Sequence, residues 1–546
     1  MIDLNKKPFN LNEKEINNVY SQLNSLNEEQ KIGQLFCILG DLYAEKELNN
    51  LVKEKAIGGI LFRPNASKTL KEKLDNLDKI SKIPLLKCAN LEDGAFGAIK
   101  EGRRIASQLE IAATDNLENS YYMGLDESYE AKEVGINVSF SPDSDIDINC
   151  FNPITNERTF GSNPKIVKAN VLNVMKGIQE NGLASFAKHF PGDGVDFRDQ
   201  HLVPTYNSLS KNLWYKTYGK IYSSLIKNGI LGIMCGHIHQ DNLSMDDNHS
   251  LKKEDCMPAS LSKELLEGVL RKELGFNGVI ATDATIMGGF NNAMKRERAI
   301  PYCIQCGVDL IVFNTSLEED LEYMKNGLKN GILTHVRLDE AVTRILALKE
   351  VLKRNIKAKL SPYNPSELER KLANESITLV KNKDKVIPLK RENYNEIEIR
   401  SLGNDEYPNG SIKEDIRKLL VKEGFKVSYF DIDKVDMHGP KNINKRKLIL
   451  YLANLETASN QTAVRINWAK KHALDMPRFI NEVDYVFISF ANPYHLMDVP
   501  RIKSCINAYC ANESVINMVI EKIMGRSPFK GVSPVDAFCN LEDTKL

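Results

Sequence analysis

The chain has 546 residues, more than one hydrophobic core usually supports, so we expect two domains. Its 73 basic and 73 acidic side chains balance, and no long run of like charge occurs, which argues against nucleic acid and anionic membranes as partners. The N-terminal residues lead into polar sequence, and no apolar stretch has the length of a membrane span. We therefore expect a cytoplasmic protein.

Short apolar or β-branched runs alternate with longer helical patterns from about residue 30 to residue 350. This alternation is typical of repeated βα units around a parallel sheet. Eight runs predict strands: 36–39, 59–62, 85–91, 138–141, 185–190, 232–238, 278–283 and 309–313. Eight such units indicate an α/β fold with a (β/α)₈ TIM-like barrel, whose catalytic groups lie at the C-terminal strand ends and in the loops that follow.

Two prolines with polar neighbours in residues 360–365 predict a domain linker. We expect a catalytic barrel over residues 1–357, a linker over 358–372 and a smaller αβα sandwich domain over 373–546. Five runs predict the strands of this second domain: 377–380, 397–399, 427–430, 448–452 and 486–490.

The segment 188–201, KHFPGDGVDFRDQH, carries the most informative chemistry of the chain. A strand-like run ends in Lys188 and His189, and a loop with glycine and proline follows. Asp199 and His201 lie two residues apart in this loop, so the carboxylate can fix the imidazole tautomer and raise its basicity. An isolated Asp-x-His is more often an incidental pair on a surface loop. Beside the other residues of this segment, the pair predicts a site of proton transfer.

The whole segment resembles, without a gap, the signature of family 3 glycoside hydrolases of the β-N-acetylglucosaminidase type. The similarity extends from residues 31–35 and 57–61 to residues 376–382 and 528–535, and so covers nearly the whole chain. It implies a catalytic barrel followed by an αβα domain. It also implies a small carbohydrate substrate containing GlcNAc, with no cofactor.

Retaining hydrolysis of a β-glycoside requires a carboxylate that attacks the anomeric carbon and a second group that transfers protons. An Asp after a strand is by itself more often a helix cap. The resemblance nevertheless implies that Asp283, at the end of the seventh predicted strand, is the nucleophile. It implies His201 as acid and base, oriented by Asp199. An imidazole pKa near ~6.5 suits both steps without the strong burial that a carboxylic acid would need.

The resemblance also implies residues that bind the sugar. Arg158, Lys188 and His189 match residues of the −1 subsite. Asn90 stands where many relatives have a substrate-binding Asp, and an arginine that bacterial cell-wall recycling enzymes carry a few positions later has no cationic match here. This difference leaves the sugar partner open. His237, on the sixth predicted strand, matches a segment that lines the pocket, and a structural role is equally compatible with the sequence.

Ten cysteines are scattered along the chain, several of them within apolar runs, which suits buried free thiols. Cys303 and Cys306 form a Cys-x-x-Cys, but no second pair lies at zinc-finger spacing. Reactive or ligating pairs normally come with a wider constellation, so we expect these two side chains to pack in a helix. We predict no metal site.

The leading hypothesis is a retaining, exo-acting β-N-acetylglucosaminidase that hydrolyses terminal β-linked GlcNAc from cell-wall fragments or chito-oligosaccharides. A β-N-acetylglucosaminide phosphorylase is an alternative, because an imidazole base does not repel an anionic acceptor as a second carboxylate would. A catalytically silent sugar-binding protein is an alternative of another class, although it would need neither nucleophile nor proton shuttle. A plain β-glucosidase generally lacks the Asp-x-His loop. The leaving group, the acceptor and the oligomeric state stay open.

Overall fold

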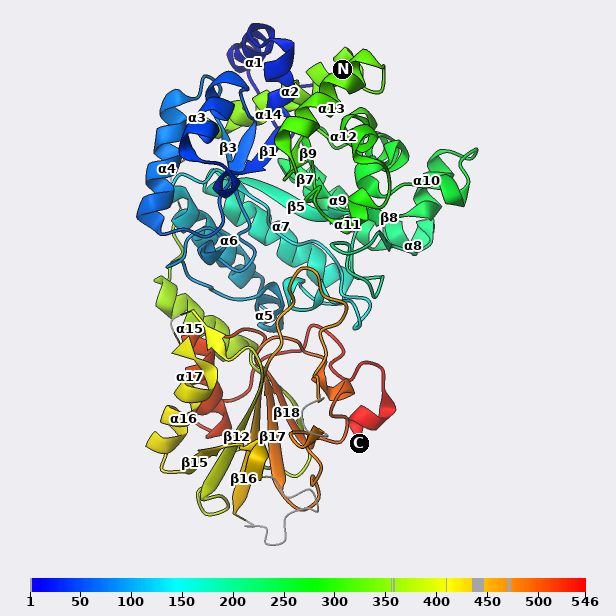
Figure 1. The fold of residues 1–546 in the computed structure, drawn as a ribbon. Helices are drawn as coiled ribbons and strands as arrows, with labels where there is room; N and C mark the ends of the chain where they lie inside the picture. Colours follow the sequence, from blue (N-terminus) through cyan, green and yellow to red (C-terminus); the bar gives the residue numbers. More distant parts are fainter. Residues whose placement is uncertain (1, 355, 357–358, 409, 435–445, 469–472) are drawn as a thin grey trace. The chain divides into compact units, whose positions relative to one another are not determined.

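The computed structural model describes residues 2–354, 356, 359–408, 410–434, 446–468 and 473–546 (Figure 1). The chain divides into two compact units. The first contains Met1–Arg103, Ser120–Asn152 and Pro164–Ser361, and the second contains Arg104–Asn119, Pro153–Asn163 and Pro362–Leu546. The barrel boundary predicted at residues 357–358 lies outside the described residues. Within the described part of the chain, no helix is both long and apolar enough to cross a bilayer.

An eight-stranded parallel sheet forms the centre of the first unit. Its strands are β1 (Phe36–Leu39), β2 (Gly59–Leu61), β3 (Leu86–Ala89), β4 (Val138–Ser139), β5 (Ala184–Phe190), β7 (Gly232–Cys235), β9 (Val279–Thr282) and β10 (Ile311–Val312). They pair in the order β10-β1-β2-β3-β4-β5-β7-β9. A parallel bridge between Ala281 and Leu310 joins the two ends, so the sheet closes into a barrel. All eight lie where the sequence predicted strands, and the fold class is confirmed.

Helices surround these strands (Figure 1). They are α1 (Glu13–Ser25), α2 (Glu28–Gln34), α3 (Glu45–Glu54), α4 (Ser67–Ile80), α6 (Leu117–Glu133), α7 (Pro164–Glu180), α8 (Lys211–Lys216), α9 (Tyr218–Lys227), α10 (Asp241–Asp247), the π-helix η6 (Glu264–Glu273), α11 (Gly288–Asn291), α12 (Arg296–Cys306), α13 (Leu317–Lys329) and α14 (His335–Leu352). A two-stranded sheet of β6 (Thr205–Tyr206) and β8 (Ile238–His239) lies outside the barrel sheet. Most residues of the barrel strands are apolar because the strands are buried on both faces, and all seven residues of β5 are buried.

The second unit contains a six-stranded mixed sheet. Its strands are β11 (Thr378–Asn382), β12 (Glu396–Gly403), β15 (Lys426–Tyr429), β16 (Lys447–Asn454), β17 (Asp484–Ser489) and β18 (Ser504–Asn507). The order is β11-β18-β17-β16-β12-β15, and β11 runs antiparallel to β18 while the other pairs are parallel. The sequence did not predict β18, because four residues with serine and asparagine at the ends show no strand pattern.

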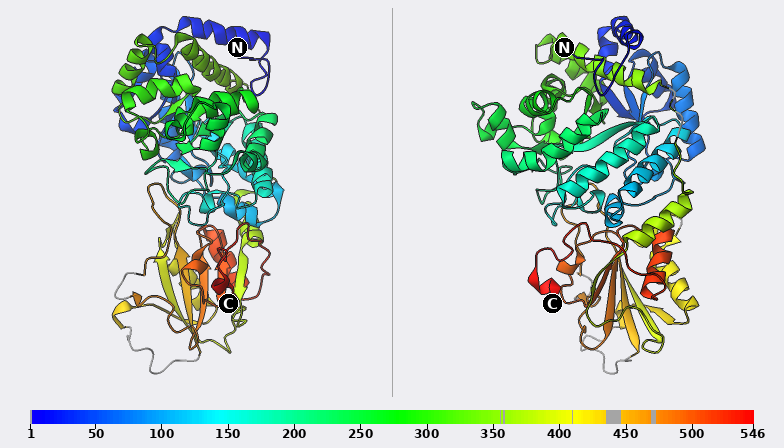
Figure 2. Two further views of the ribbon diagram at one scale, coloured as in Figure 1. Left: turned by 90° about the vertical axis from the view of Figure 1, so that its right-hand side faces the viewer. Right: turned by 180° about the vertical axis from the view of Figure 1, so that it is seen from behind.

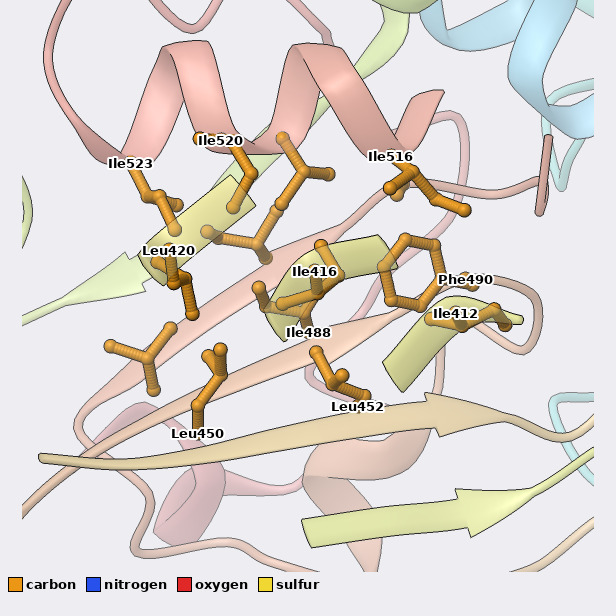
Figure 3. Packing of buried hydrophobic residues seen from close by; sticks show 14 of the residues in the cluster. Ile412, Ile416, Leu420, Leu450, Leu452, Ile488, Phe490, Ile516, Ile520 and Ile523 are labelled. Atoms are coloured by element: carbon orange, nitrogen blue, oxygen red, sulfur yellow. The ribbon is translucent and has the colours of Figure 1, made fainter. Parts of the chain in front are cut away.

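Along one side of this sheet lie α15 (Pro365–Ser376), α16 (Ile412–Lys422) and α17 (Glu513–Ile523), as the right-hand view of Figure 2 shows. Helix α5 (Gln108–Ala113) belongs to the same unit. Ile412, Ile416 and Leu420 are four residues apart on α16 and therefore share one face of that helix. They pack with residues of α17, β16 and β17 in a single core (Figure 3). Alternate residues of β16 enter a second core on the other face.

Candidate active site

The C-terminal ends of the barrel strands bring together most of the predicted site residues. Asn90 directly follows β3, and Asp283 directly follows β9. Lys188 and His189 lie near the C-terminal end of β5, and one residue separates His237 from the end of β7. Parallel strands of a closed barrel all end at the same side. These five side chains therefore originate from one end of the barrel, although they are far apart in sequence.

Asp283 presents one unpaired carboxylate oxygen. Its Oδ1 accepts the backbone N–H of Ala284 at 2.7 Å. Its Oδ2 is buried, has no hydrogen-bond partner among the described residues and lies 3.7 Å from Nε2 of His189. Burial alone would raise the pKa of Asp283, but the positive charge that His189, His201 and His237 carry when they are protonated outweighs burial and lowers this pKa to about 2. The carboxylate is thus anionic at neutral pH, and Oδ2 is the atom available for attack.

His201 and Asp199 form a closely held pair on the loop after β5. Nδ1 of His201 lies 2.7 Å from Oδ1 of Asp199, and the backbone N–H of His201 donates to the same oxygen at 2.8 Å. The Asp199 side chain is fully buried, whereas 19% of the His201 side chain is exposed. Because the carboxylate accepts from Nδ1, the opposite ring atom Nε2 is directed away from Asp199 and can meet a substrate oxygen.

The loop that carries this pair is anchored at several points. The backbone N–H of Asn149 donates to the carbonyl of Gly194 at 2.9 Å. Nδ2 of Asn152 donates to Oδ1 of Asp193 and to the carbonyl of Asp196, both at 2.9 Å. These bonds tie the loop to residues that follow β4. The glycines and the proline therefore do not leave this loop free, because the side-chain amide of Asn152 and the backbone of Asn149 hold it.

Arg198 adds a second kind of anchor to the same loop. Its guanidinium makes a bidentate pair with Asp196, at 2.9 and 2.6 Å, and lies 5.4 Å from the ring centroid of Tyr206. Oδ2 of Asp196 also accepts the backbone N–H of Tyr206 at 2.9 Å. The planar guanidinium of Arg198 is already ordered by these contacts, so it loses little further entropy when substrate binds. Residues before and after Asp199 in the chain are thus held in place.

His189 is oriented by carboxylates that follow β4. Its Nδ1 lies 2.7 Å from Oδ2 of Asp145 and 3.8 Å from Oδ2 of Asp143. These three residues are the group within the described part of the chain whose possible metal-ligand atoms all lie within 4.8 Å of one another. Oδ1 of Asp145 also accepts two backbone N–H groups, those of His189 and Asp193. Such hydrogen bonds fit a carboxylate that holds an imidazole with its Nε2 toward Asp283.

Lys188 is buried and bound to two side chains that follow β3. Its Nζ forms an ion pair with Glu92 and donates to Oδ1 of Asn90 at 3.5 Å. Only 3% of the Lys188 side chain and 13% of the Glu92 side chain are exposed, whereas Asn90 is exposed. Glu92 was not among the site residues predicted from the sequence. The signal that could have identified it is its place directly after the strand predicted over residues 85–91.

His237 uses both ring nitrogens within the protein. Nδ1 lies 2.8 Å from the hydroxyl of Ser260, and Nε2 lies 3.1 Å from the carbonyl of Ala284. Burial lowers the pKa of His237 to about 4, although the charge of Asp283 acts in the other direction. A neutral ring that donates from Nε2 and accepts at Nδ1 satisfies both contacts. The geometry favours a role in holding the backbone beside Asp283 over the sugar contact suggested by the sequence.

Gln200 connects the loop after β5 to the end of β7. It was not among the site residues predicted from the sequence. Its Oε1 accepts the backbone N–H of His237 at 2.7 Å, and its Nε2 lies 3.4 Å from Oδ2 of Asp193. Its side chain is fully buried. A glutamine between Asp199 and His201 carries no sequence signal of this role, because its partners come from another strand end and from the start of the loop.

Arg158 belongs to the second unit. It ends the short helix η3 (Asn156–Arg158) in the segment Pro153–Asn163. Its Nη1 donates to the carbonyl of Ile154 at 3.5 Å, and its own carbonyl accepts from Gln108 of α5. The structure therefore does not unite Arg158 with the barrel residues in one compact unit, and its contact with sugar stays a prediction. Cys303 and Cys306 are buried free thiols on α12.

Comparison with known proteins identifies the family of this chain. Residues 27–348 match the glycosyl hydrolase family 3 N-terminal domain. A β-N-acetylglucosaminidase/β-glucosidase of Cellulomonas fimi is 38% identical over 564 aligned residues, which span 100% of each chain. β-Hexosaminidase A of Pseudoalteromonas piscicida is 29% identical over 63% of this chain and 62% of its own. The structure of a β-glucoside phosphorylase, BglX, is 40% identical, with a TM-score of 0.92 over 99% of both chains. This chain therefore belongs to glycoside hydrolase family 3 and is a glycoside hydrolase.

Proposed function

We propose that this enzyme is a retaining, exo-acting β-N-acetylglucosaminidase that removes terminal β-linked GlcNAc from cell-wall fragments or chito-oligosaccharides. The observation that carries the proposal is the buried, unpaired Oδ2 of Asp283 at a strand end, close enough to His201 for the imidazole charge to lower the carboxylate pKa. A nucleophile and an oriented imidazole are the two groups that a retaining double displacement needs. The names of the Cellulomonas fimi and Pseudoalteromonas piscicida relatives support the sugar.

In the first half-reaction, Oδ2 of Asp283 attacks the anomeric carbon and forms a glycosyl ester while the glycosidic C–O bond breaks. The protonated His201 transfers the proton of Nε2 to the leaving oxygen. The buried carboxylate of Asp199 stabilises the imidazolium before this transfer and keeps the ring in place afterwards. Lys188 is placed to donate to a sugar hydroxyl at the same strand ends.

In the second half-reaction, the neutral Nε2 of His201 takes a proton from water as the water oxygen attacks the anomeric carbon. The ester bond to Asp283 breaks, and the sugar leaves with its original β configuration. The same imidazole thus acts first as acid and then as base, as microscopic reversibility requires.

Phosphate is a second candidate for the acceptor. The 40% identity to a β-glucoside phosphorylase over 99% of both chains favours it. The carboxylate of the proton-transfer pair, Asp199, is fully buried behind His201, so this pair presents an imidazole and not a carboxylate to an incoming anion. A phosphate dianion needs no deprotonation before it attacks the anomeric carbon of the glycosyl ester. The bond to Asp283 then breaks, which gives a sugar 1-phosphate and restores the Asp283 carboxylate.

The test is product analysis with aryl β-GlcNAc and aryl β-glucoside, each with and without inorganic phosphate. The proposal predicts faster turnover of the GlcNAc substrate and release of free GlcNAc, first as the β anomer by proton NMR. Formation of GlcNAc 1-phosphate, with a rate that rises with phosphate, would instead assign phosphorolysis. A preference for the glucoside would overturn the proposed sugar, and no turnover of either substrate would favour a sugar-binding protein.

A further inference from the structure

Three arginines surround one buried aspartate at the end of the barrel opposite the catalytic residues. Asp309 comes shortly before β10, at the N-terminal end of the strands. Arg271 comes from η6, and Arg337 and Arg344 come from α14, two turns apart on the same helix. None of these residues takes part in the proposed chemistry.

The three guanidinium groups converge on a single carboxylate. Nη2 of Arg271 lies 2.6 Å from Oδ2 of Asp309, and Nη2 of Arg337 lies 2.7 Å from Oδ1. Nη1 of Arg344 lies 3.5 Å from Oδ1. The exposed fractions of the arginine side chains are 6%, 7% and 10%, and Asp309 is fully buried. The cluster is thus close to complete desolvation.

The positive charge of this cluster exceeds its negative charge. Three guanidinium groups share one carboxylate, and burial of unpaired charge is strongly unfavourable. Burial, together with the charge of Arg344, lowers the pKa of Arg271 to about 9 even though Asp309 acts in the opposite direction. Glu267 also acts on Arg271 electrostatically, but in the described part of the chain no ion pair within 4.0 Å joins these two residues. At least one positive charge is left for another anion to compensate.

Among the described residues, several buried N–H donors of the cluster have no hydrogen-bond acceptor. They are Nε and Nη1 of Arg337 and Nε of Arg344. Nη1 of Arg344 makes no hydrogen bond either, and its contact is the 3.5 Å ion pair with Asp309. Nη1 of Arg271, in contrast, donates to the carbonyls of Phe276 and Gly278, at 3.1 and 2.6 Å. Buried N–H groups are nearly always paired with protein, water or an ion. Unpaired donors and excess positive charge at the same place both indicate an anionic ligand.

We propose that Arg337 and Arg344, with Arg271 beside them, bind a small inorganic anion of the size of chloride. A monatomic anion accepts several N–H donors without a fixed direction, and the three guanidinium groups already converge within 3.5 Å of one carboxylate. The anion compensates the charge that Asp309 alone leaves unbalanced. This site is independent of the proposed function.

The site has a structural consequence for the barrel. Oδ2 of Asp309 accepts the backbone N–H of Ile280 in β9 at 3.0 Å. Strand β9 ends directly before Asp283, so the cluster fixes the start of the strand that presents the nucleophile. We therefore expect the bound anion to stabilise the folded barrel, and to affect the rate of the chemical step little.

The test is the melting temperature of the full chain as bromide replaces methanesulfonate at constant ionic strength. Above the dissociation constant, we expect Tm to rise by about 2 °C for each tenfold increase in bromide. Arg344→Leu removes one positive charge and the donors Nε and Nη1, neither of which makes a hydrogen bond among the described residues, and should abolish this dependence. Arg354→Leu is the control, because its side chain is 35% exposed and pairs with Glu15, and it should keep the dependence.

A second measurement is the anomalous signal of bromide in crystals, which should show a peak beside Arg337 and Arg344. An unchanged Tm in all salts would overturn the proposal, as would an equal bromide response in Arg344→Leu. A peak without a Tm response would mean an adventitious ion only and would likewise overturn it. If sulfate or phosphate raised Tm at lower concentrations than bromide, the site would take polyatomic anions and the proposed chloride-sized ligand would be wrong. If Arg344→Leu does not fold, Arg344→Gln serves the same comparison.

Discussion

Oδ1 of Asp199 accepts two hydrogen bonds from the same residue, one from Nδ1 of His201 at 2.7 Å and one from its backbone N–H at 2.8 Å. The two bonds fix the imidazole ring relative to its own backbone. Because the carboxylate is fully buried, water does not compete for these bonds. The tautomer with the proton on Nδ1 is therefore favoured whenever the ring is neutral, and Nε2 is the atom that exchanges protons.

Replacing His201 by alanine removes this atom. We expect a loss of roughly 10²–10⁴-fold in kcat/KM for substrates with poor leaving groups, and a much smaller loss for an activated aryl glycoside, which departs with little protonation. Azide should restore part of the second step. The measurement is a series of aryl leaving groups of different pKa. Exposed His249→Ala is the control and should behave as wild type. Equal losses across the series, without azide rescue, would return the acid/base role to another group.

Asp199→Asn keeps the imidazole but weakens its orientation. We expect a smaller loss than in His201→Ala, with a similar dependence on the leaving group, because the amide accepts from Nδ1 less strongly than the carboxylate does. The measurement is kcat/KM for the same series of aryl leaving groups. Wild-type values across the series would show that Asp199 does not orient His201.

Asp283→Ala should abolish turnover of all substrates, because its Oδ2 forms the covalent bond. A 2-fluoro sugar with a good leaving group should label Asp283, and peptide mapping locates the label. Since the pKa of this carboxyl is lowered to about 2, no loss of activity between pH 7 and pH 4 should come from Asp283. Exposed Asp246→Asn is the control for removal of a carboxylate. A label on another carboxylate would disprove the assignment.

Lys188→Met should reduce kcat/KM by roughly 5–150-fold, which corresponds to about 1–3 kcal/mol. The change removes the ion pair between Lys188 and the partly buried Glu92, and it removes a donor from the strand ends. Good and poor leaving groups should be affected alike, since the contact is to the retained sugar. The control is Lys87→Met in β3, where the lysine pairs with half-exposed Asp78 at 2.6 Å. Comparable losses in both variants would mean that the effect of Lys188 is not specific to the site.

His237 predicts a pH dependence of stability. Its pKa is about 4 in the folded protein against an ordinary value of 6.5. Between these values the unfolded chain binds a proton that the folded protein does not, so folding free energy is lost as the pH falls from 6.5 to 4. The loss is about 3 kcal/mol for this group. Urea unfolding at several pH values should show a weaker acid dependence in His237→Gln, and an unchanged one in His249→Gln. The same slope in all three proteins would contradict the prediction.

The sequence alone determined the barrel and the identity of the main chemical groups. Eight largely apolar runs marked the strands because a strand buried on both faces needs mostly apolar side chains. The ends of these runs located Lys188, His189 and Asp283, because polar residues at the C-terminal ends of barrel strands share one side. The spacing of Asp199 and His201 was sufficient to predict their pairing, since two residues are a local distance.

Contacts between distant segments were decided only by the tertiary structure. The ion pair of Lys188 with Glu92 joins β5 to the segment after β3, and both ring nitrogens of His237 are used by Ser260 and Ala284. Residues 104–119 and 153–163 belong to the second unit although they lie within the predicted barrel domain. No periodicity records such contacts, because they depend on which strand ends and loops the closed barrel brings together, and not on the residues that are neighbours in the chain.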